Sequence, residues 1–244
     1  MPATPTVTPT PGPDQFTCYK AHITRQTLPF TPADGVSLVD QFASATMDVS
    51  KPVSLCNPAD QNGGDPTAPA HPLHLTRYMI KAPKTAARFA TIHDQRVVNQ
   101  FGELFVDILK PVQLLVPSGM SLIGHPPVPV NPALDHFVCY TVRVTRGTAK
   151  FAPILGMTTI TDQLGTLTVD VTKPTMLCAP TDMNNTAPGA EAHTEHLMCY
   201  KVRAVRGAPK FTKVTPVFAT DHLGVETLDV ISRQEICVPS LKNP

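Results

Sequence analysis

Six cysteines recur along this chain with a nearly constant spacing, and the spacing divides the chain into copies of one unit. Within each pair the two cysteines are separated by 38, 39 and 38 residues, respectively: Cys18 and Cys56, Cys139 and Cys178, Cys199 and Cys237. A fixed internal period is the signature of a repeat architecture, in which every unit folds in the same way. We therefore predict that the whole chain is built from repeats.

A fourth copy lacks both cysteines. The segment around His74 and Tyr78 matches the segment around Cys199, and it places Arg77 and Leu115, again 38 residues apart, where the two cysteines should stand. Unrelated thiols would have no reason to disappear together, so their joint absence indicates that the two positions are partners. Six cysteines allow fifteen pairings, and we predict the pairing within each repeat; buried free thiols are the alternative. We expect Arg77 to face the solvent. The predicted disulfides are Cys18–Cys56, Cys139–Cys178 and Cys199–Cys237.

Other residue types keep one place in every repeat. We call the position of the first cysteine in each repeat the first anchor and that of the second cysteine the second anchor. A tyrosine directly follows the first anchor, a base lies seven residues after the first anchor, and an aspartate lies eight residues before the second anchor. We interpret the tyrosines as core residues rather than a sugar-binding platform, and the aspartates and bases as recurring ion pairs. A turn quartet also begins at an equivalent place in each repeat. The sets are Tyr19, Tyr78, Tyr140 and Tyr200; Arg25, Lys84, Arg146 and Arg206; Asp48, Asp107, Asp170 and Asp229; and Asp40, Asn99, Asp162 and Asp221.

Alternating polar and apolar residues predict strands. Residues 167–171 and 138–144 both alternate in this way, which is typical of a half-buried strand. Turn residues separate these short runs, and a helical stripe of apolar residues is lacking. The sequence therefore predicts an all-β protein with about four strands in each repeat, packed as a β-sandwich or a partly closed barrel.

The repeats are arranged in two pairs. The step from Cys56 to Arg77 is 21 residues, as is the step from Cys178 to Cys199, whereas a proline-rich join separates the second repeat from the third. We predict two tandem, disulfide-stapled domains at 14–118 and 135–240, with a linker at 119–134. Residues 1–13 form a Pro/Thr-rich tether, typical of an extended segment. The tether lacks the pattern of a secretory signal, so we expect the signal to be removed or to lie upstream.

Composition and charge exclude several classes of protein. The chain has 244 residues, 42% of them hydrophobic, and its formal net charge is +1. A charge so close to zero offers no general attraction for nucleic acid, and the apolar runs are too short to predict a membrane span. Three disulfides predict an oxidising compartment, so we expect a secreted or cell-surface protein.

Two HxxH motifs are the candidate metal ligands. They are His71 with His74 and His193 with His196, at equivalent places in the two pairs of repeats. Imidazoles bind copper and zinc. In an extended chain, however, residues three apart point to opposite faces, and His136 matches the second histidine of each motif, which favours a structural role. We expect no cofactor, and the alternative is a copper or zinc site at these four histidines.

The motifs of hydrolases and nucleotide-binding enzymes are lacking, so we predict no catalytic residue. The motifs Cys-Tyr-Lys and Lys-Pro-x-x-Leu-Cys-x-Pro resemble those of a family of secreted bacterial repeat domains of unknown function; the second motif stands at 51–58 and 173–180. The resemblance implies an extracellular bacterial setting and says nothing of a substrate. We expect a non-catalytic binding, adhesion or structural module with an extracellular or cell-surface partner. A metal-binding protein or metalloenzyme is the alternative.

Overall fold

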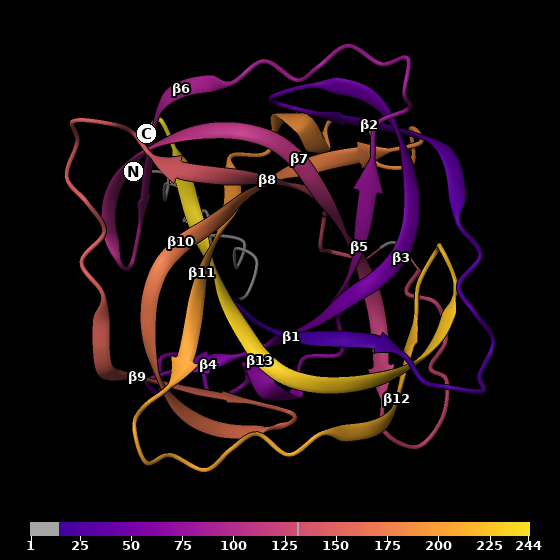
Figure 1. The fold of residues 1–244 in the computed structure, drawn as a ribbon. Coiled ribbons are helices and arrows are strands. Elements are labelled where there is room, and N and C mark those ends of the chain that lie inside the picture. Colours follow the sequence, from indigo (N-terminus) through magenta and orange to yellow (C-terminus); the bar gives the residue numbers. More distant parts are fainter. Residues whose placement is uncertain (1–14, 131) are drawn as a thin grey trace, which may run out of the picture.

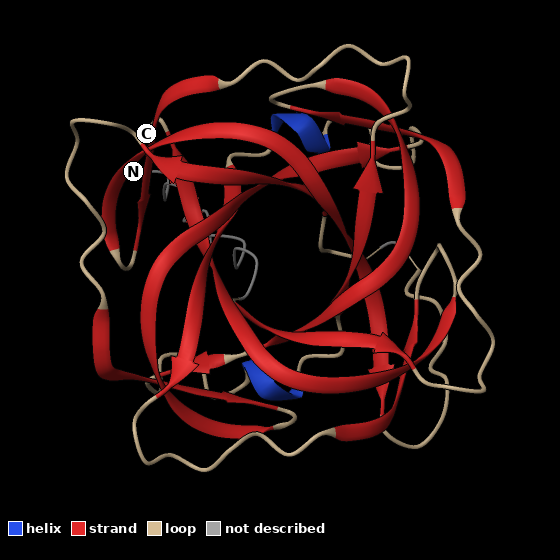
Figure 2. Cartoon of the chain, in the orientation of Figure 1, coloured by secondary structure: helices blue, strands red, loops and turns tan. Residues whose placement is uncertain are grey.

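The protein is all-β, as predicted. The computed structural model describes residues 15–130 and 132–244, so the predicted tether at 1–13 lies outside the described residues. Figures 1 and 2 show long curved strands joined by loops. In the described part of the chain, the only helical segments are two 3-10 turns of three residues each, η1 (Ala68–Ala70) and η2 (Ala190–Ala192).

Each repeat contributes a first strand, a middle strand and a long strand, where about four strands were expected. The long strand stays continuous through the Lys-Pro positions, because the chain accommodates them with a shift of register on either side instead of a turn. A two-residue strand, β4 (Asp60–Gln61), follows the first repeat. The strands are β1 (Phe16–Ile23), β2 (Ala33–Asp40) and β3 (Ser44–Pro58); β5 (His74–Lys81), β6 (Ile92–Asn99) and β7 (Gly102–Ser121); β8 (His136–Val144), β9 (Ile154–Asp162) and β10 (Gly165–Met183); β11 (Glu195–Ala204), β12 (Val214–Thr220) and β13 (Val225–Lys242).

First and long strands alternate around a closed circuit of antiparallel pairs, which we call the central ring. Its order is β1, β3, β5, β7, β8, β10, β11, β13 and back to β1. Figure 1 is a view down the axis of this ring, with β3, β7, β10 and β13 curving around its centre. The second and third repeats pair through β7 and β8 just as the first and second pair through β3 and β5. The predicted division into two domains is therefore not confirmed, because one sheet contains both halves.

The sheet is not a simple barrel, because segments that follow the ring pair with middle strands. The end of β10 pairs with β2, and the end of β7 pairs with β12. The end of β13 pairs with β6, and β4 pairs with β9. Each of these pairings joins a repeat to the repeat two positions away. Opposite sides of the molecule are thus hydrogen-bonded to one another as well as to their neighbours.

The four tyrosines are buried core residues, as predicted, and they explain why the turn quartet recurs. The hydroxyl of Tyr140 donates to Asp40 Oδ2 at 2.7 Å, across two repeats. Tyr19 and Tyr78 donate to the equivalent aspartates, Asp162 and Asp221, at 2.6 and 2.8 Å. In the fourth case the amide of Asn99 donates to the hydroxyl of Tyr200 at 2.8 Å. A phenylalanine of the preceding repeat packs on each tyrosine, with ring centroids 5.0–5.2 Å apart: Phe211, Phe30, Phe89 and Phe151.

The recurring aspartates form ion pairs, but the predicted partners were wrong. Asp107 contacts Arg143 at 2.9 Å and Asp170 contacts Arg203 at 3.0 Å. These bases lie four residues after the first anchor, not seven, because the first strand continues past the anchor and places its fourth residue directly opposite the aspartate. Both arginines are largely exposed, so each pair contributes at most about 1 kcal/mol.

We predict that Tyr140→Phe lowers the free energy of unfolding by about 2 kcal/mol, because hydrogen bonds to charged groups are the stronger class. Burial raises the pKa of Asp40 to about 6, and the hydrogen bond from Tyr140 opposes that rise. The cost should therefore be largest above pH 6, where Asp40 is ionised. Urea unfolding at pH 5 and pH 8 measures it.

The matched control is Tyr200→Phe, since the amide of Asn99 is neutral and also donates to Ser240 at 3.0 Å. We expect a cost of about 1 kcal/mol or less there, independent of pH. Equal costs for the two variants at both pH values would contradict the role given to Asp40.

Candidate functional site in the central ring

The structure contains the three predicted disulfides, and each joins the first strand of a repeat to the long strand of the same repeat. Cys18 lies directly opposite Cys56, and Cys199 lies directly opposite Cys237. Directly opposed residues point to the same face of a sheet. In this sheet that face is the interior of the central ring, where all six cysteines are fully buried.

The three disulfides form a row inside the ring. Cys18 Sγ lies 3.7 Å from Cys237 Sγ, and Cys178 Sγ lies 3.9 Å from Cys199 Sγ. Two residues before each first anchor, a layer of large apolar side chains closes one end of the interior. This layer consists of Phe16, Leu75, Phe137 and Leu197, all buried.

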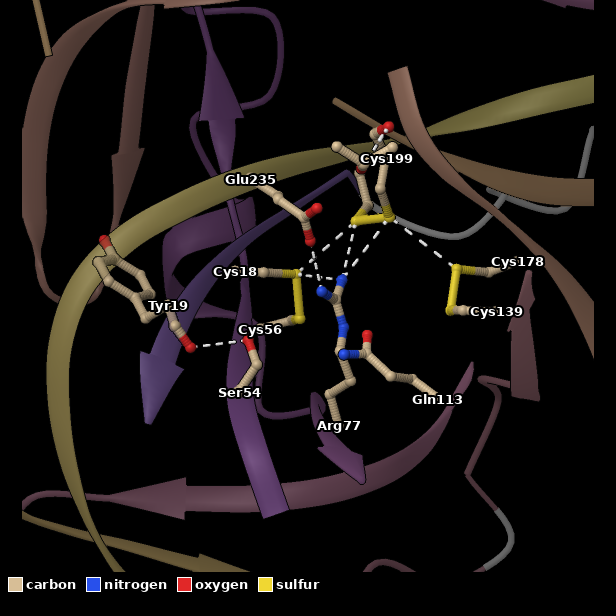
Figure 3. Close-up of polar contacts among 12 residues, drawn as sticks. Cys18, Tyr19, Ser54, Cys56, Arg77, Gln113, Cys139, Cys178, Cys199 and Glu235 are labelled. Atoms are coloured by element: carbon tan, nitrogen blue, oxygen red, sulfur yellow. Dashed lines mark hydrogen bonds and ion pairs between the residues drawn. A yellow bond between two sulfur atoms is a disulfide. The ribbon is translucent and has the colours of Figure 1, made fainter. Parts of the chain in front are cut away.

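Arg77 also lies inside the ring, so the expectation that it faces the solvent was wrong. It is 3% exposed. Its Nη2 lies 3.2 Å from Cys18 Sγ and 3.3 Å from Cys237 Sγ, and its Nη1 donates to Glu235 (Figure 3). The physical reason is the alternation of the strand, because the position that holds cysteine in other repeats points inward whatever residue occupies it. That equivalence could have placed Arg77 from the sequence, whereas no pattern identified Glu235 as its partner.

Lysines surround the other end of the interior. Lys20 and Lys201 lie two residues after an inward-facing cysteine, on the same face of the strand. Three further lysines on the long strands lie directly opposite a residue that is two positions after a first anchor: Lys51 opposite Met79, Lys110 opposite Thr141 and Lys173 opposite Lys201. All five are exposed. We call Lys20, Lys51, Lys110, Lys173 and Lys201 the mouth lysines.

A cavity of about 370 Å³ lies at this mouth and reaches Arg77. Gln113, Met176, Lys201 and Glu235 are among the residues that line it, and Glu235 is the one acidic residue in that lining. Since the whole chain has a net charge of only +1, five lysines around one opening mean that charge is unevenly distributed. Net charge alone could not reveal this, because the five lysines are far apart in the sequence.

The HxxH histidines are separated by burial. His71 and His193 are exposed, and His193 Nδ1 lies 2.7 Å from Asp135 Oδ2. His74 and His196 are almost fully buried. Among residues 15–130 and 132–244, no group of three or more His, Cys, Asp or Glu side chains could hold a metal ion. The structure thus gives no support to the alternative of a copper or zinc site.

Three histidines occupy one buried repeat position: His74, His136 and His196. His74 Nδ1 lies 3.1 Å from Asn57 Oδ1, and His196 Nδ1 lies 3.0 Å from the carbonyl oxygen of Thr194. Burial lowers the pKa of each of the three to about 4. They are neutral at physiological pH and belong to the packing of the fold.

Comparison with known protein families, with curated proteins and with solved structures found no match to this chain. Within the described residues, no helix is long and apolar enough to cross a membrane. The geometry of the ring and its charges is therefore the basis for assigning a function.

We predict that Arg77→Met lowers the free energy of unfolding by about 3 kcal/mol, because it leaves the Glu235 carboxylate without its buried partner. The double variant Arg77→Met/Glu235→Met should recover most of this loss, since the third repeat already carries Met176 at the position of Glu235. Urea unfolding of the wild type, both single variants and the double variant forms the thermodynamic cycle. Additive losses would show that the two side chains do not interact.

We predict that His74→Gln reduces the dependence of stability on pH. In the wild type, His74 takes up a proton near pH 6.5 when unfolded and near pH 4 when folded. The unfolded state therefore binds more protons between these values, and the free energy of unfolding falls as the pH decreases from 6.5 to 4. Over that range, the free energy of unfolding of the variant should fall by up to about 3 kcal/mol less than that of the wild type. Urea unfolding measures the difference.

Glutamine suits this test because the first repeat carries Gln15 at the position of His74. The control is His222→Gln, an exposed histidine at a position where the other repeats carry glutamine. An identical pH profile for His74→Gln and the wild type would show that burial of His74 does not affect stability in this way.

Proposed function

We propose that this protein is an extracellular, non-catalytic binding module whose mouth lysines hold an acidic polysaccharide. The observation that carries the proposal is the convergence of the five mouth lysines on one opening. They come from all four repeats, in a chain whose formal net charge is only +1. An arrangement of this kind offers many weak contacts to an anionic polymer.

An extracellular location is supported by the disulfides, because bonds of this kind persist in oxidising compartments. All six cysteines are paired. The resemblance to secreted bacterial repeat domains supports the same location, and an acidic polysaccharide is a ligand that such a location offers.

A non-catalytic role is supported by the way the fold uses its reactive groups. The buried aspartates of the turn quartet accept hydrogen bonds from tyrosines, and the buried histidines fill one repeated packing position. These contacts recur from repeat to repeat, which is expected of groups that maintain the fold. The cysteines are likewise used in structural bridges.

Two of the mouth lysines, by contrast, are placed unfavourably for stability. Lys173 lies directly opposite Lys201 on the neighbouring strand, and like charges so placed destabilise a sheet by about 0.2–1 kcal/mol. Retaining two cations in register is understandable if an anion lies over them. Because all five lysines are exposed, their attraction for a polymer is screened by salt.

We predict that Lys20→Gln/Lys173→Gln/Lys201→Gln weakens binding to dextran sulfate about tenfold at 50 mM salt. Each exposed lysine contributes about 0.5 kcal/mol to such a contact, and the three together give about 1.5 kcal/mol, roughly a factor of ten. Calorimetric titration at 50 and 200 mM salt measures the affinity and its dependence on salt, with neutral dextran as the comparison ligand.

The matched control removes three exposed lysines from the loops between first and middle strands: Lys84→Gln/Lys150→Gln/Lys210→Gln. This variant has the same net charge as the mouth variant but keeps all five mouth lysines. It should therefore retain wild-type affinity. Equal weakening in both variants would reject the mouth as the binding site. Binding of a DNA duplex in preference to dextran sulfate would reject the assignment to polysaccharide.

A further inference from the structure

An apolar groove with a volume of about 970 Å³ lies beside the ring mouth. It lies between the start of β3 in the first repeat and the loop after β5 in the second repeat. Its walls include Met47, Met79, Ile80, Phe89 and Val112. Both its size and its apolar walls are typical of small-molecule sites.

The groove is bordered by positive charge. Lys81, Arg88 and Lys110 line it, and no acidic residue is among its lining residues. Lys110 is also a mouth lysine, so the groove adjoins the mouth. An occupant that complements this surface has an apolar body and a single acidic group.

The same place exists between the third and fourth repeats, but there it is divided into two smaller hollows, of about 470 and 330 Å³. Two of the equivalent positions that differ change the space available. Leu167 stands where the larger groove has Ala45, and Arg233 stands where it has Pro111. The Arg233 guanidinium donates to the Tyr19 hydroxyl at 2.5 Å and to the carbonyl oxygen of Gly165 at 3.1 Å, and so it occupies space that Pro111 leaves open.

We propose that the larger groove binds an amphipathic carboxylate, such as a medium-chain fatty acid. The chain lies against Met47, Met79 and Phe89, and the carboxylate lies at Arg88 or Lys110. This site goes beyond the binding of polysaccharide and does not depend on it. A free fatty acid and an anionic membrane lipid share the chemistry that the groove recognises.

The first experiment titrates the protein with octanoate, decanoate and dodecanoate below their micellar concentrations, using calorimetry. Each additional buried methylene should strengthen binding about three- to fourfold. Dodecyltrimethylammonium, which has the same chain on a cationic head, should bind at least tenfold more weakly than dodecanoate. No binding of dodecanoate, or equal binding of the cation, would overturn the proposal.

Variants locate the site. Ala45→Leu introduces the residue that stands at the equivalent position between the third and fourth repeats, and it should weaken dodecanoate binding at least tenfold. The converse variant, Leu167→Ala, should leave the affinity of the larger groove for dodecanoate unchanged. Arg88→Gln does not touch the core and should weaken binding about fivefold. Lys150→Gln, at the position equivalent to Arg88 in the third repeat, should have no effect. Wild-type affinity in both Ala45→Leu and Arg88→Gln would overturn the proposal.

Two further measurements separate the sources of the ligand and the two binding sites. Sedimentation with phosphatidylglycerol vesicles, abolished by Ala45→Leu, would identify a membrane lipid as the ligand, and binding of dodecanoate alone would identify the free acid. The Lys20, Lys173 and Lys201 triple variant should retain dodecanoate binding while it loses dextran sulfate. Loss of both ligands in that variant would contradict a separate groove site.

Discussion

The structure depends on the opposition of the first strand and the long strand at the disulfide position. Cys18 faces Cys56 and Cys199 faces Cys237 in register, and this register decides which side chains enter the central ring. A slip of one residue would turn every inward side chain outward, so a bridge at this level fixes both the pairing and the alternation. On the chain-entropy model, each bridge contributes about 4 kcal/mol by limiting the unfolded chain.

Contacts between opposite repeats make the four units one structure. The Tyr140 hydroxyl reaches Asp40 in the repeat two positions away, and the end of β10 pairs with β2 of that same repeat. A repeat that contacted only its neighbours could unfold singly, as in a linear array. Here each unit supplies the hydrogen-bond partner of a buried tyrosine or carboxyl group on the far side, so loss of one repeat leaves unsatisfied groups in another.

Local features were predictable from the sequence, and features that depend on distant repeats were not. The disulfides, the strand at 138–144 and the buried tyrosines follow from spacing and alternation, which act within one unit. The single closed sheet does not, because the pairing of β13 with β1 joins the two ends of the chain and leaves no local pattern. In the candidate site, the inward position of Arg77 could be predicted from its equivalence with the cysteines of the other repeats. Its ion pair with Glu235 joins side chains 158 residues apart, which spacing cannot reveal.

Departures from the repeat pattern concentrate in the second and fourth repeats, and they meet in the ring. Where the second repeat lacks a disulfide, Arg77 fills the space, and the fourth repeat supplies Glu235 to balance its charge. The fourth repeat also replaces Lys-Pro with Ser232-Arg233. This arginine lines both of the smaller hollows at the equivalent place, whereas Pro111 lines the single larger groove. Residues common to all repeats satisfy requirements of folding that every unit shares. Residues that differ are released from those requirements, so the open groove, whose walls differ between the repeats, is where selection for a ligand can act.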